Sequence, residues 1–409
     1  MKIAYIHQYF NTPEMSGSTR SYEIATGLAR RGHQVAVVTT WREQTPAPGW
    51  THTSQDGVEI HWLRVPYSNH MGYGARLRAF GRFALGAGEK AAGLHSNVVY
   101  ATSTPLTVAI PGIYCARRKR IPMVFEVRDL WPEVPIKLGA LKNRVAIWMA
   151  QALERAAYRN ADHVIALSPD MAAGVRRVFP QAGVTVIPNF CHDINHLPSE
   201  WSGPVRAVVG ESRRPVILYA GTIGLVNNIG YMLRLAQASR DLGHPLAYVV
   251  VGDGREAQQI RSAALKSGVL NGNFFMLPPV PKRDMKRILA TAEIATSFVL
   301  PEPVLWANSA NKIFDGLAAG RPIAINHGGW LADLLTRTGA GLVLPPDDTV
   351  RAAQMLNGLI QDSRRLKEAQ KAALGLARSE FDPAVLVDKL ELILTQCISR
   401  REHAPRCGR

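Results

Sequence analysis

Lys312 and Asp315 stand in the mostly apolar segment SANKIFDGLAAGRPI, residues 309–323. This composition favours a short, mostly buried helix that ends at Gly320, with Pro322 just beyond it. Lys312 and Asp315 lie three residues apart, so they share one face of this helix. Because buried charges are costly without partners, the two side chains either pair with each other or serve a ligand that carries phosphate and hydroxyl groups.

The start of the same helix favours an anion. We take Asn308 and Ser309 as its N-cap residues. The backbone N–H groups from Asn308 to Asn311 are then expected to be free to bind a diphosphate. Lys312 adds a positive charge, and the Asp315 carboxylate suits the vicinal hydroxyls of a ribose. The segment therefore predicts a nucleoside diphosphate site, with an internal Lys–Asp pair as the structural alternative.

Three glycine-containing turns after expected strands are weaker candidates. Gly17 is expected to open a helix, Gly221 stands in LYAGTIG, and Gly252 stands in VVVGDG. Glycine in such places often only permits a tight turn. VVVGDGREA also resembles the start of a dinucleotide fingerprint. It lies in the middle of its domain, however, and lacks a clear acidic residue about 20 positions later, so no dinucleotide cofactor is predicted.

These candidates stand at the ends of regularly alternating strands and helices. Strands are expected at KIAYIH, QVAVVTT, VVYAT, MVFEV, HVIAL and VTVIP in the first half, and at VILYAG, AYVVVGDG, NFFML, IATSF, PIAIN and AGLVLP in the second. Such alternation is typical of doubly wound parallel sheets. We therefore predict an α/β fold with two Rossmann-like domains, in which ligands bind at the carboxyl ends of the strands.

A stretch rich in Pro, Gly and Ser, PSEWSGPVRAVVGESRRP, separates the two halves. We place the N-terminal domain at residues 1–200, a linker at 201–214, and the C-terminal domain at 215–382. Residues 383–409 are expected to form a helix with a basic tail, which could pack back on the N-terminal domain.

Composition narrows the classes of function. The net charge is +16, which favours polyanionic partners such as phosphorylated substrates or an anionic membrane. No zinc finger, RNP motif or long basic block is present, so nucleic acid is not predicted. The N-terminal residues do not resemble a signal peptide, and no apolar run reaches the ~18 residues of a spanning helix. The four cysteines are scattered, which favours a reducing cytoplasm.

A basic amphipathic helix is expected from Arg76 to Leu94. Its apolar stripe contains Leu77, Phe80, Ala84, Ala87, Ala91 and Leu94, and Arg76, Arg78, Arg82 and Lys90 lie mainly beside it. Together with CARRKR, residues 115–120, this helix is suited to an anionic membrane surface. The alternative is that the stripe packs on the first domain's sheet, and both can hold at once.

The chain resembles the retaining glycosyltransferases of the large bacterial family 4. The resemblance rests on GSTRSYEIATGLARRGHQVAVVTT, VFEVRDLWPE, VIPNF, LYAGTIG, VVVGDG and NKIFDGLAAGRPI, and it covers most of the chain. The branch that builds O-antigen, capsule and exopolysaccharide, including fucosaminyltransferase-like enzymes, is the most similar. The resemblance implies a GT-B fold of two domains that face a cleft, and transfer of a hexosyl or N-acetylamino sugar from a nucleotide sugar. UDP is the expected nucleotide, with GDP left open.

The resemblance also implies donor roles in the C-terminal domain. The base should lie near Val280, the ribose on Asp315, and the diphosphate on the amides of Asn308–Asn311. Thr222 and Asn227 occupy the places where family members carry an Arg and a Lys that bind the diphosphate. Ala307 replaces the first acid of the family's paired glutamates. Lys312 is therefore expected to supply the missing charge, and the turns at Gly17, Gly221 and Gly252 to lie on the donor side.

In the N-terminal domain, Arg128 and Asp129 stand where many members carry His-Asp. Asp129 is expected to contact the sugar or the acceptor, and both residues are candidates for catalysis. Arg128 is alternatively a phosphate ligand, a partner of Glu126, or half of a structural Arg–Asp pair. His7 and Arg20 are placed on the acceptor side, although a lone His at a strand end also fits a packing role.

The implied mechanism is a front-face attack assisted by the leaving phosphate, because no enzymic nucleophile is evident. No Asp-x-Asp motif is placed to hold a divalent ion, so neither a metal nor another cofactor is expected. The implied acceptor is a polyprenyl-diphosphate-linked saccharide, which puts the protein in the cytoplasm, peripheral on the inner face of the plasma membrane. A sugar-nucleotide epimerase of the same fold and a non-catalytic basic scaffold that binds membrane or nucleic acid stay open as alternatives.

Overall fold

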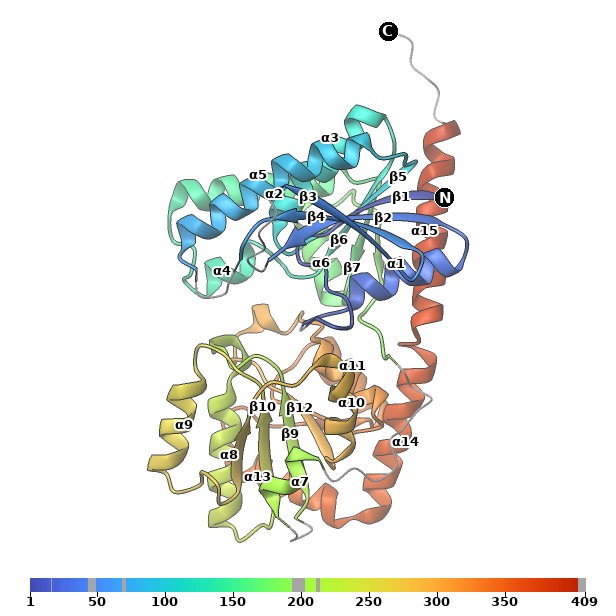
Figure 1. Ribbon diagram of the computed structural model, residues 1–409. Helices are drawn as coiled ribbons and strands as arrows, with labels where there is room; N and C mark the ends of the chain where they lie inside the picture. The colour runs from blue at the N-terminus through green and yellow to red at the C-terminus, as the bar shows by residue number, and fades with distance from the viewer. Residues whose placement is uncertain (16, 43–48, 68–70, 193–202, 211–213, 404–409) are drawn as a thin grey trace. The chain divides into compact units, whose positions relative to one another are not determined.

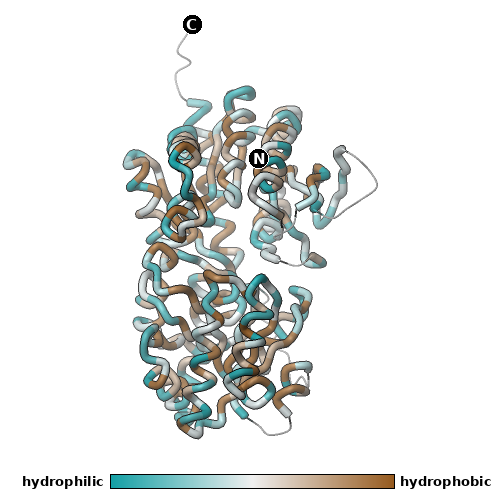
Figure 2. The backbone as a smooth tube through the Cα atoms, turned by 90° about the vertical axis from the view of Figure 1, so that its left-hand side faces the viewer, coloured by the Kyte–Doolittle hydropathy of each residue, from teal (hydrophilic) through white to brown (hydrophobic). Residues whose placement is uncertain are grey.

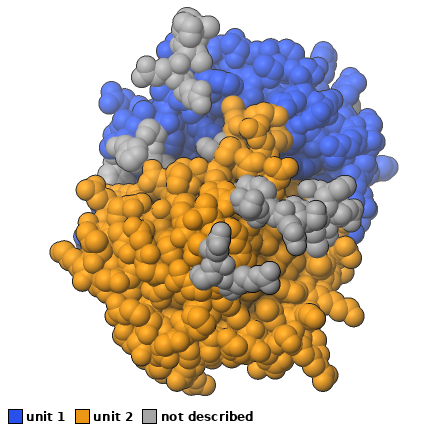
Figure 3. Space-filling view, turned by 60° about the horizontal axis from the view of Figure 1, so that its bottom comes forward, with its two compact units in different colours: residues 1–12, 18–188, 383–409 blue, residues 13–17, 189–382 orange. Residues whose placement is uncertain are grey.

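The computed structural model describes residues 1–15, 17–42, 49–67, 71–192, 203–210 and 214–403. The chain forms two compact units (Figure 3). Unit 1 consists of Met1–Thr12, Ser18–Pro188 and Pro383–Arg409, and unit 2 of Pro13–Gly17 and Asn189–Asp382. Each unit has its own parallel sheet covered by helices, as the alternating sequence pattern predicts (Figure 1).

The sheet of unit 1 has eight strands in the order β3-β4-β2-β1-β5-β6-β7-β8. All neighbouring pairs are parallel except the antiparallel pair of β3 and β4. The strands are β1 (Lys2–Ile6), β2 (Gln34–Trp41), β3 (Trp50–Gln55), β4 (Val58–Arg64), β5 (Val98–Thr102), β6 (Met123–Val127), β7 (His163–Ala166) and β8 (Val184–Val186). The six predicted strands of this half are present, and the β3–β4 hairpin is an addition that the sequence reading missed.

The helices of unit 1 are α1 (Arg20–Arg30), α2 (Tyr73–Gly93), η1 (Leu106–Val108), α3 (Ala109–Lys119), α4 (Glu133–Lys137), α5 (Arg144–Asn160), α6 (Pro169–Val178) and α15 (Pro383–His403). Helix α15 packs against α1, although the two are far apart in sequence (Figure 1). Arg31 pairs with Asp388 at 2.5 Å and with Glu391 at 3.3 Å. These contacts attach the C-terminal helix to unit 1.

The sheet of unit 2 has six parallel strands in the order β11-β10-β9-β12-β13-β14. Its strands are β9 (Val216–Ala220), β10 (Ala247–Val251), β11 (Phe274–Leu277), β12 (Ile294–Ser297), β13 (Ile323–Ile325) and β14 (Gly341–Val343), all of which were predicted. Its helices are α7 (Pro204–Val209), η2 (Leu225–Asn227), α8 (Ile229–Asp241), α9 (Ala257–Lys266), α10 (Lys282–Ala290), η3 (Pro303–Leu305), α11 (Asn311–Ala318), α12 (Trp330–Thr338), α13 (Thr349–Gln361) and α14 (Ser363–Ser379).

Strand β9 shows how the sheet of unit 2 is buried on both faces. Val216, Leu218 and Ala220 belong to one hydrophobic cluster, whereas Ile217 and Tyr219 belong to another. Successive side chains of a strand point to opposite faces, so the two clusters lie on the two sides of the sheet. This double burial explains the continuous apolar strands of the sequence, seen as brown stretches in Figure 2.

The predicted linker at residues 201–214 contains a helix. Within it, α7 runs from Pro204 to Val209, and Val205 and Val209 are buried in the hydrophobic core of unit 2. Residues 201–202 and 211–213 lie outside the described residues. Proline at the first helical position is compatible with a helix, which the reading of this segment as a loop overlooked.

Helix α2 lies where the amphipathic helix was expected, but its buried face differs from the predicted stripe. Ala79 and Phe83 are buried together with Ala84, Ala87 and Ala91, whereas Leu77 is 66% exposed. The alternative that the whole stripe packs on the sheet therefore does not hold for Leu77. The face opposite the core carries exposed leucines as well as arginines.

Cysteines and membrane spans give two further results for the described part of the chain. Cys115, Cys191 and Cys397 are buried and form no disulfide, and Cys407 lies outside the described residues. None of the described helices is long and apolar enough to cross a membrane.

Candidate functional site

Helix α11 of unit 2 positions Lys312 beside the carboxyl end of β9. Its ammonium donates to the hydroxyl of Tyr219 at 2.8 Å and to Oδ1 of Asn227 at 3.1 Å. The same Nζ lies 4.3 Å from the centroid of the Tyr219 ring. Burial lowers the pKa of Lys312 to about 7, because these neutral partners do not replace the water that an ammonium loses. An anion placed here would therefore gain a close positive charge.

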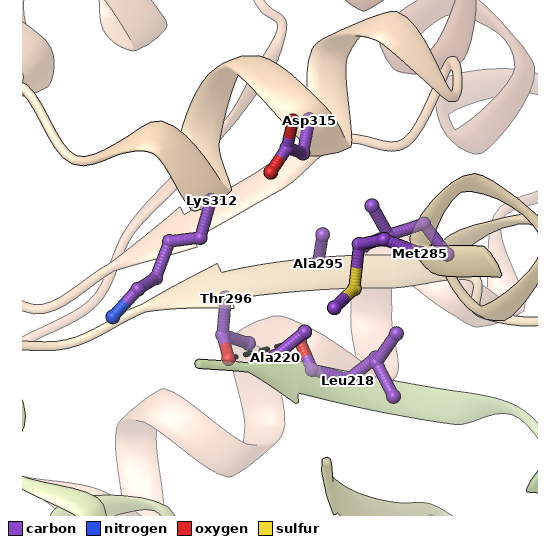
Figure 4. A pocket seen from close by; sticks show the side chains of 8 residues that line it. Leu218, Ala220, Met285, Ala295, Thr296, Lys312 and Asp315 are labelled. Atoms are coloured by element: carbon purple, nitrogen blue, oxygen red, sulfur yellow. Dashed lines mark hydrogen bonds between the residues drawn. The ribbon is translucent and has the colours of Figure 1, made fainter. Parts of the chain in front are cut away.

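Asp315 lies one turn further along α11 and has a different partner. Both of its carboxylate oxygens accept from Nζ of Lys282 at 2.6 Å, and both side chains are about four-fifths buried, at 17% and 21% exposed. In Figure 4 Lys312 extends away from Asp315 along the helix. The alternative of an internal Lys312–Asp315 pair is therefore wrong, because each charge is bound elsewhere.

A small cavity lies under these two side chains. It has a volume of about 20 Å³ and is lined by Leu218, Ala220, Met285, Leu289, Ala295, Thr296, Lys312 and Asp315 (Figure 4). A space of this size holds about one water molecule. The cavity is therefore too small to hold a nucleotide.

The start of α11 differs from the prediction. Ala310 is the N-cap residue, and Asn311 is the first helical residue. The amide of Asn308 donates to the carbonyl of Leu305 at 3.1 Å, so its expected role as a free donor is wrong. Within the described residues, no acceptor contacts the amides of Asn311 and Lys312. The same holds for the amides of Ser309 and Ala310, so the predicted diphosphate cradle loses Asn308, while the amides of Ser309, Ala310 and Asn311 stay candidates.

Asn308 and Ser309 instead hold the loop that leads into α11. The carbonyl of Asn308 accepts from Nε1 of Trp330 at 3.0 Å, and the carbonyl of Ser309 accepts from Nδ2 of Asn189. The Ser309 hydroxyl is buried and has no hydrogen-bond partner in the described chain. Since a buried hydroxyl normally finds a partner, Ser309 stays a candidate for a ligand contact.

In two of the predicted glycine turns, at Gly221 and Gly252, close backbone contacts explain why the residue is glycine. The amide of Gly221 donates to Val251 at 2.9 Å, and that of Gly252 donates to Leu277 at 3.1 Å, so neither amide is available to a donor nucleotide. A Cβ atom on Gly252 would lie 1.9 Å from the carbonyl oxygen of Gly221. Glycine is thus required to bring the ends of β9 and β10 together, and a donor-side role of either residue does not involve its amide.

Three of the remaining donor-side candidates can be placed relative to Lys312. Gly221 adjoins it, since a Cβ there would lie 3.2 Å from Cε of Lys312. Asn227 binds its ammonium, and the carbonyl of Thr222 accepts from the Tyr219 hydroxyl at 2.7 Å. The structure thus brings Gly221, Thr222 and Asn227 together around Lys312 and Tyr219.

Val280 and Gly17, the other two donor-side candidates, have no described contact with Lys312 or Tyr219. Val280 is half-buried and packs against the core of unit 2, two residues before Lys282. Gly17 is exposed with a φ of +122°, and the predicted turn Gly17-Ser18-Thr19 leads directly into helix α1, whose N-cap residue is Thr19.

Tyr219 and Lys282 are the site residues that sequence reasoning missed. Lys282 follows PPVP, the loop already expected near the base, and it is one of few basic residues there. Tyr219 is the only hydroxyl-bearing residue of VILYA. A search for partners of the two charges on α11 could have singled out both.

In unit 1, Arg20 belongs to a buried ion pair. Its Nη2 and Nε lie 2.7 and 3.0 Å from Oε1 of Glu126, and it also donates to the carbonyls of Ile187 and Pro188. Arg20 is 2% exposed, so it cannot contact an acceptor directly, and the predicted acceptor-side role is wrong. It fixes the start of α1 to the centre of the sheet.

Glu126 also accepts from two strand residues. The hydroxyl of Tyr100 donates at 2.8 Å and that of Thr102 at 3.1 Å. Burial alone would raise the pKa of Glu126, but the charges of Arg20 and Arg128 and these hydrogen bonds outweigh it and hold the pKa below its usual value. Glu126 is therefore an ionised structural residue and not a candidate acid.

Arg128 and Asp129 follow β6 and do not pair with each other in the described chain. Nη2 of Arg128 donates to the hydroxyl of Ser18 at 3.0 Å, and its amide donates to that of Ser103. Asp129 is exposed, and its carboxylate accepts weakly from Thr104 at 3.4 Å. The structure therefore favours neither a structural Arg–Asp pair nor a direct Arg128–Glu126 contact, and it leaves Asp129 accessible.

His7 lies immediately after β1 and is 2% exposed, with Nδ1 unpartnered within the described residues. Burial, together with the charges of Arg128 and Arg42, lowers its pKa well below the usual value. Its imidazole is therefore neutral at physiological pH. This is compatible with a packing role or with one hydrogen bond to a ligand.

Two families of known proteins match successive parts of the chain. Residues 17–189 match the family described as glycosyl transferase 4-like domain, and residues 214–362 match glycosyl transferases group 1. No curated protein matches the chain.

Solved structures of glycosyltransferases share the fold. Sucrose-phosphate synthase from Thermosynechococcus elongatus superposes with a TM-score of 0.78 at 16% identity, covering 97% of this chain and 99% of that one. HepE from Anabaena, solved with UDP and glucose, superposes with a TM-score of 0.69 at 18% identity. The match covers 97% of this chain and 100% of that one. WaaG, a glycosyltransferase involved in lipopolysaccharide biosynthesis, superposes with a TM-score of 0.67 at 16% identity. The match covers 96% of this chain and 99% of that one. At these identities the likeness shows the GT-B fold.

Proposed function

We propose that this chain, which is a glycosyltransferase with a family 4-like domain followed by a group 1 domain, is a retaining enzyme that uses a nucleotide sugar. The observation that carries the proposal is the pair of separately held charges on α11. Within the described residues Lys312 contacts only the neutral groups of Tyr219 and Asn227, and Asp315 is a carboxylate one turn away. Their separation suits a ligand with a phosphate at one end and hydroxyls at the other.

The donor diphosphate binds at the start of α11 in this proposal. The amides of Asn311 and Lys312 and the Lys312 ammonium provide donors and positive charge for it. When the sugar–phosphate bond breaks, negative charge develops on the departing diphosphate, and these groups stabilise it. Lys312 thereby takes the role that Thr222 and Asn227 cannot fill, since neither side chain is charged.

The ribose binds Asp315. Lys282 contacts each carboxylate oxygen once, and an ionised carboxylate has about four acceptor positions. Two ribose hydroxyls can therefore donate to Asp315 while Lys282 stays in place and keeps the carboxylate oriented. UDP is the nucleotide to test first, which the HepE complex with UDP and glucose supports.

Asp129 is proposed as the contact of unit 1 to the transferred sugar or the acceptor. Its exposure supports this, as does its place directly after the parallel strand β6, where ligands of such sheets bind. Arg128 is proposed to position this turn through its contacts with Ser18 and Ser103. His7 would line the same end of the sheet.

The acceptor is proposed to be a lipid-linked saccharide of bacterial surface polysaccharide synthesis, reached at the inner membrane. Helices α2, α3 and α5 are neighbours in unit 1 and expose large apolar side chains. Leu85 is 76% exposed and Trp148 is 68% exposed. Arg78 and Arg82 on α2 and Arg118 on α3 are also exposed. Apolar and basic side chains on one surface suit the interface of an anionic bilayer.

An open groove on α3 adds to this surface. It has a volume of about 670 Å³ and is lined by Ile110, Ile113, Tyr114, Arg117, Arg118 and Arg120. Arginines beside apolar side chains suit an anionic phospholipid headgroup with the start of its acyl chain. The name of WaaG, which links a protein of this fold to lipopolysaccharide, further supports a role in surface glycoconjugates.

The test of the donor site is the affinity for UDP, measured by isothermal titration calorimetry. Asp315→Asn removes the charged acceptor and should weaken binding by about 2–3 kcal/mol, roughly 30- to 150-fold in Kd. Asp241→Asn, an exposed acid on α8, is the matched control and should bind as the parent does. An Asp315→Asn protein that is folded and binds UDP within twofold of the parent contradicts the ribose assignment.

Two measurements separate the proposal from its alternatives. A transferase releases nucleoside diphosphate at a rate that depends on an acceptor, whereas an epimerase converts the nucleotide sugar without one. A non-catalytic scaffold would bind neither UDP nor nucleotide sugars with saturation.

A further inference from the structure

Three side chains of types that can ligate a metal ion lie together on the β3–β4 hairpin of unit 1, outside the proposed donor site. In the antiparallel register, His52 of β3 is opposite His61 of β4, and Ser54 is opposite Glu59. Glu59 and His61 are two residues apart on one strand, so they point to the same face as His52. The hairpin therefore presents two imidazoles and a carboxylate together at the edge of the sheet.

The distances between these side chains suit one ion. A ligand atom from each of the three residues lies within 4.8 Å of the others, and the rings of His52 and His61 are 4.9 Å apart between centroids. A tetrahedral zinc ion with ligands at about 2.0–2.2 Å holds its ligand atoms at a comparable, somewhat shorter spacing. His52 and Glu59 are exposed, so their side chains have room to turn toward an ion.

His61 supplies the second, independent observation. It is 8% exposed, and neither ring nitrogen has a hydrogen-bond partner within the described residues. An imidazole buried with both nitrogens unsatisfied is unfavourable, and native proteins rarely leave such a group without a partner. A metal ion at Nδ1 or Nε2 would remove this cost.

We propose that His52, Glu59 and His61 bind a divalent transition-metal ion, with Zn²⁺ as the ion to test. Neutral imidazole and carboxylate are ligands that Zn²⁺ accepts, and three protein ligands leave one coordination position for water.

Lys90 is the one cation that faces the group among the described contacts of His61. Its ammonium lies 5.6 Å from the centroid of the Trp50 ring, on the α2 side of the hairpin. The carboxylate of Glu59 offsets it in the metal complex. The site therefore remains a two-histidine, one-carboxylate set with a neighbouring positive charge, which limits its affinity.

The ion would stabilise the pairing of the two strands at the edge of the sheet. Strand β3 is the terminal strand and pairs only with β4, and its middle four residues are all exposed. A metal bound to His52 on β3 and to Glu59 and His61 on β4 connects the two strands. Between β4 and β6 lie β2, β1 and β5, so this site is separate from Arg128 and Asp129. Its role is structural and does not rest on the proposed function.

The experiment uses the full chain without an affinity histidine tag, treated with EDTA and then dialysed. Zinc chloride is titrated in by calorimetry, and thermal unfolding is followed with and without it. One equivalent should bind, and the unfolding midpoint should rise with zinc concentration because the ion binds the folded state. Co²⁺ in place of Zn²⁺ should give the absorption bands of a four-coordinate site.

Two exposed residues provide the variants, because His61 is buried and its replacement affects folding. His52→Gln and Glu59→Gln should each weaken zinc binding by more than the roughly 10- to 100-fold that loss of a second-shell partner costs. His95→Gln, an exposed histidine outside the hairpin, is the control and should bind as the parent does. Absence of stoichiometric binding in the parent, or equal binding in folded His52→Gln and Glu59→Gln proteins, overturns the proposal.

Discussion

At the scale of single residues, Lys312 should make UDP binding at the proposed donor site depend on pH. In the free protein burial lowers its pKa from 10.5 to about 7, so a large share of the side chain is neutral at pH 8. A bound diphosphate favours the ammonium and raises this pKa, so binding above pH 7 takes up a proton. UDP affinity should therefore fall as pH rises from 7.5 to 8.5, by up to about tenfold.

Calorimetry in two buffers of different ionisation enthalpy measures this proton uptake directly. Uridine, which has no phosphate, should show no such dependence on pH. Lys312→Met should abolish the pH dependence of UDP affinity, and it should weaken the binding of UDP more than the binding of uridine. A Lys312→Met protein that keeps the pH dependence of the parent would show that another group titrates.

At the scale of elements, the turn between β10 and α9 is held by a close contact of two backbones. Gly252→Ala places a Cβ 1.9 Å from the Gly221 carbonyl, at a φ of +152°, so the ends of β9 and β10 must separate. We expect a loss of about 2 kcal/mol or more in the free energy of unfolding. UDP binding should also weaken, because Gly221 adjoins Lys312.

Gly243→Ala is the matched control. Its φ is also positive, at +68°, but an added Cβ meets nothing within 4 Å. Its cost should be only about 1 kcal/mol, from the backbone conformation alone. Urea unfolding compares the two variants. Equal losses would mean that the contact with Gly221 is readily relieved.

The ion pair between α1 and β6 governs the stability of unit 1. Arg20→Ala leaves Glu126 ionised, buried and without its main partner, which should cost about 3–5 kcal/mol. Arg30→Ala, at the exposed end of the same helix, should cost less than about 0.5 kcal/mol. Unfolding in urea, followed by circular dichroism, measures both. If the two variants unfold alike, the buried pair does not stabilise unit 1.

At the scale of the whole molecule, the net charge of +16 is expected to attract the protein to an anionic membrane surface. The chain should bind vesicles that contain anionic lipid and dissociate at high salt, since each basic residue near such a surface contributes about 1 kcal/mol. Replacing Arg78, Arg82 and Arg118 by Glu should abolish vesicle binding in a flotation assay. Activity on a water-soluble acceptor should persist.

A triple variant of unit 2 tests whether the surface or the total charge matters. Arg261, Lys266 and Arg351 are exposed on α9 and α13, and their replacement by Glu changes the net charge equally. This protein should still float with anionic vesicles. Equal flotation of the parent with neutral and anionic vesicles would refute electrostatic docking.

Most of the architecture follows from local sequence. Each predicted strand is a short apolar run bounded by turns, and burial on both faces of a parallel sheet requires such a run. The β3–β4 hairpin was missed because WTHTSQ is polar and lies exposed at the sheet edge. The start of α11 was misplaced because Asn308 and Ser309 have good capping side chains, yet Ala310 is the N-cap residue.

The sequence by itself determined the two α/β halves, the segment that carries the proposed donor site, and the two charges of Lys312 and Asp315. Only the tertiary structure decided their partners. Lys312 contacts Tyr219, 93 positions away, and Asp315 contacts Lys282, 33 positions away. The physical reason is that local sequence sets backbone preference and periodicity, whereas strand order sets which distant side chains meet. A charge in an apolar helix shows that a partner is needed, and the order of strands in the sheet selects it.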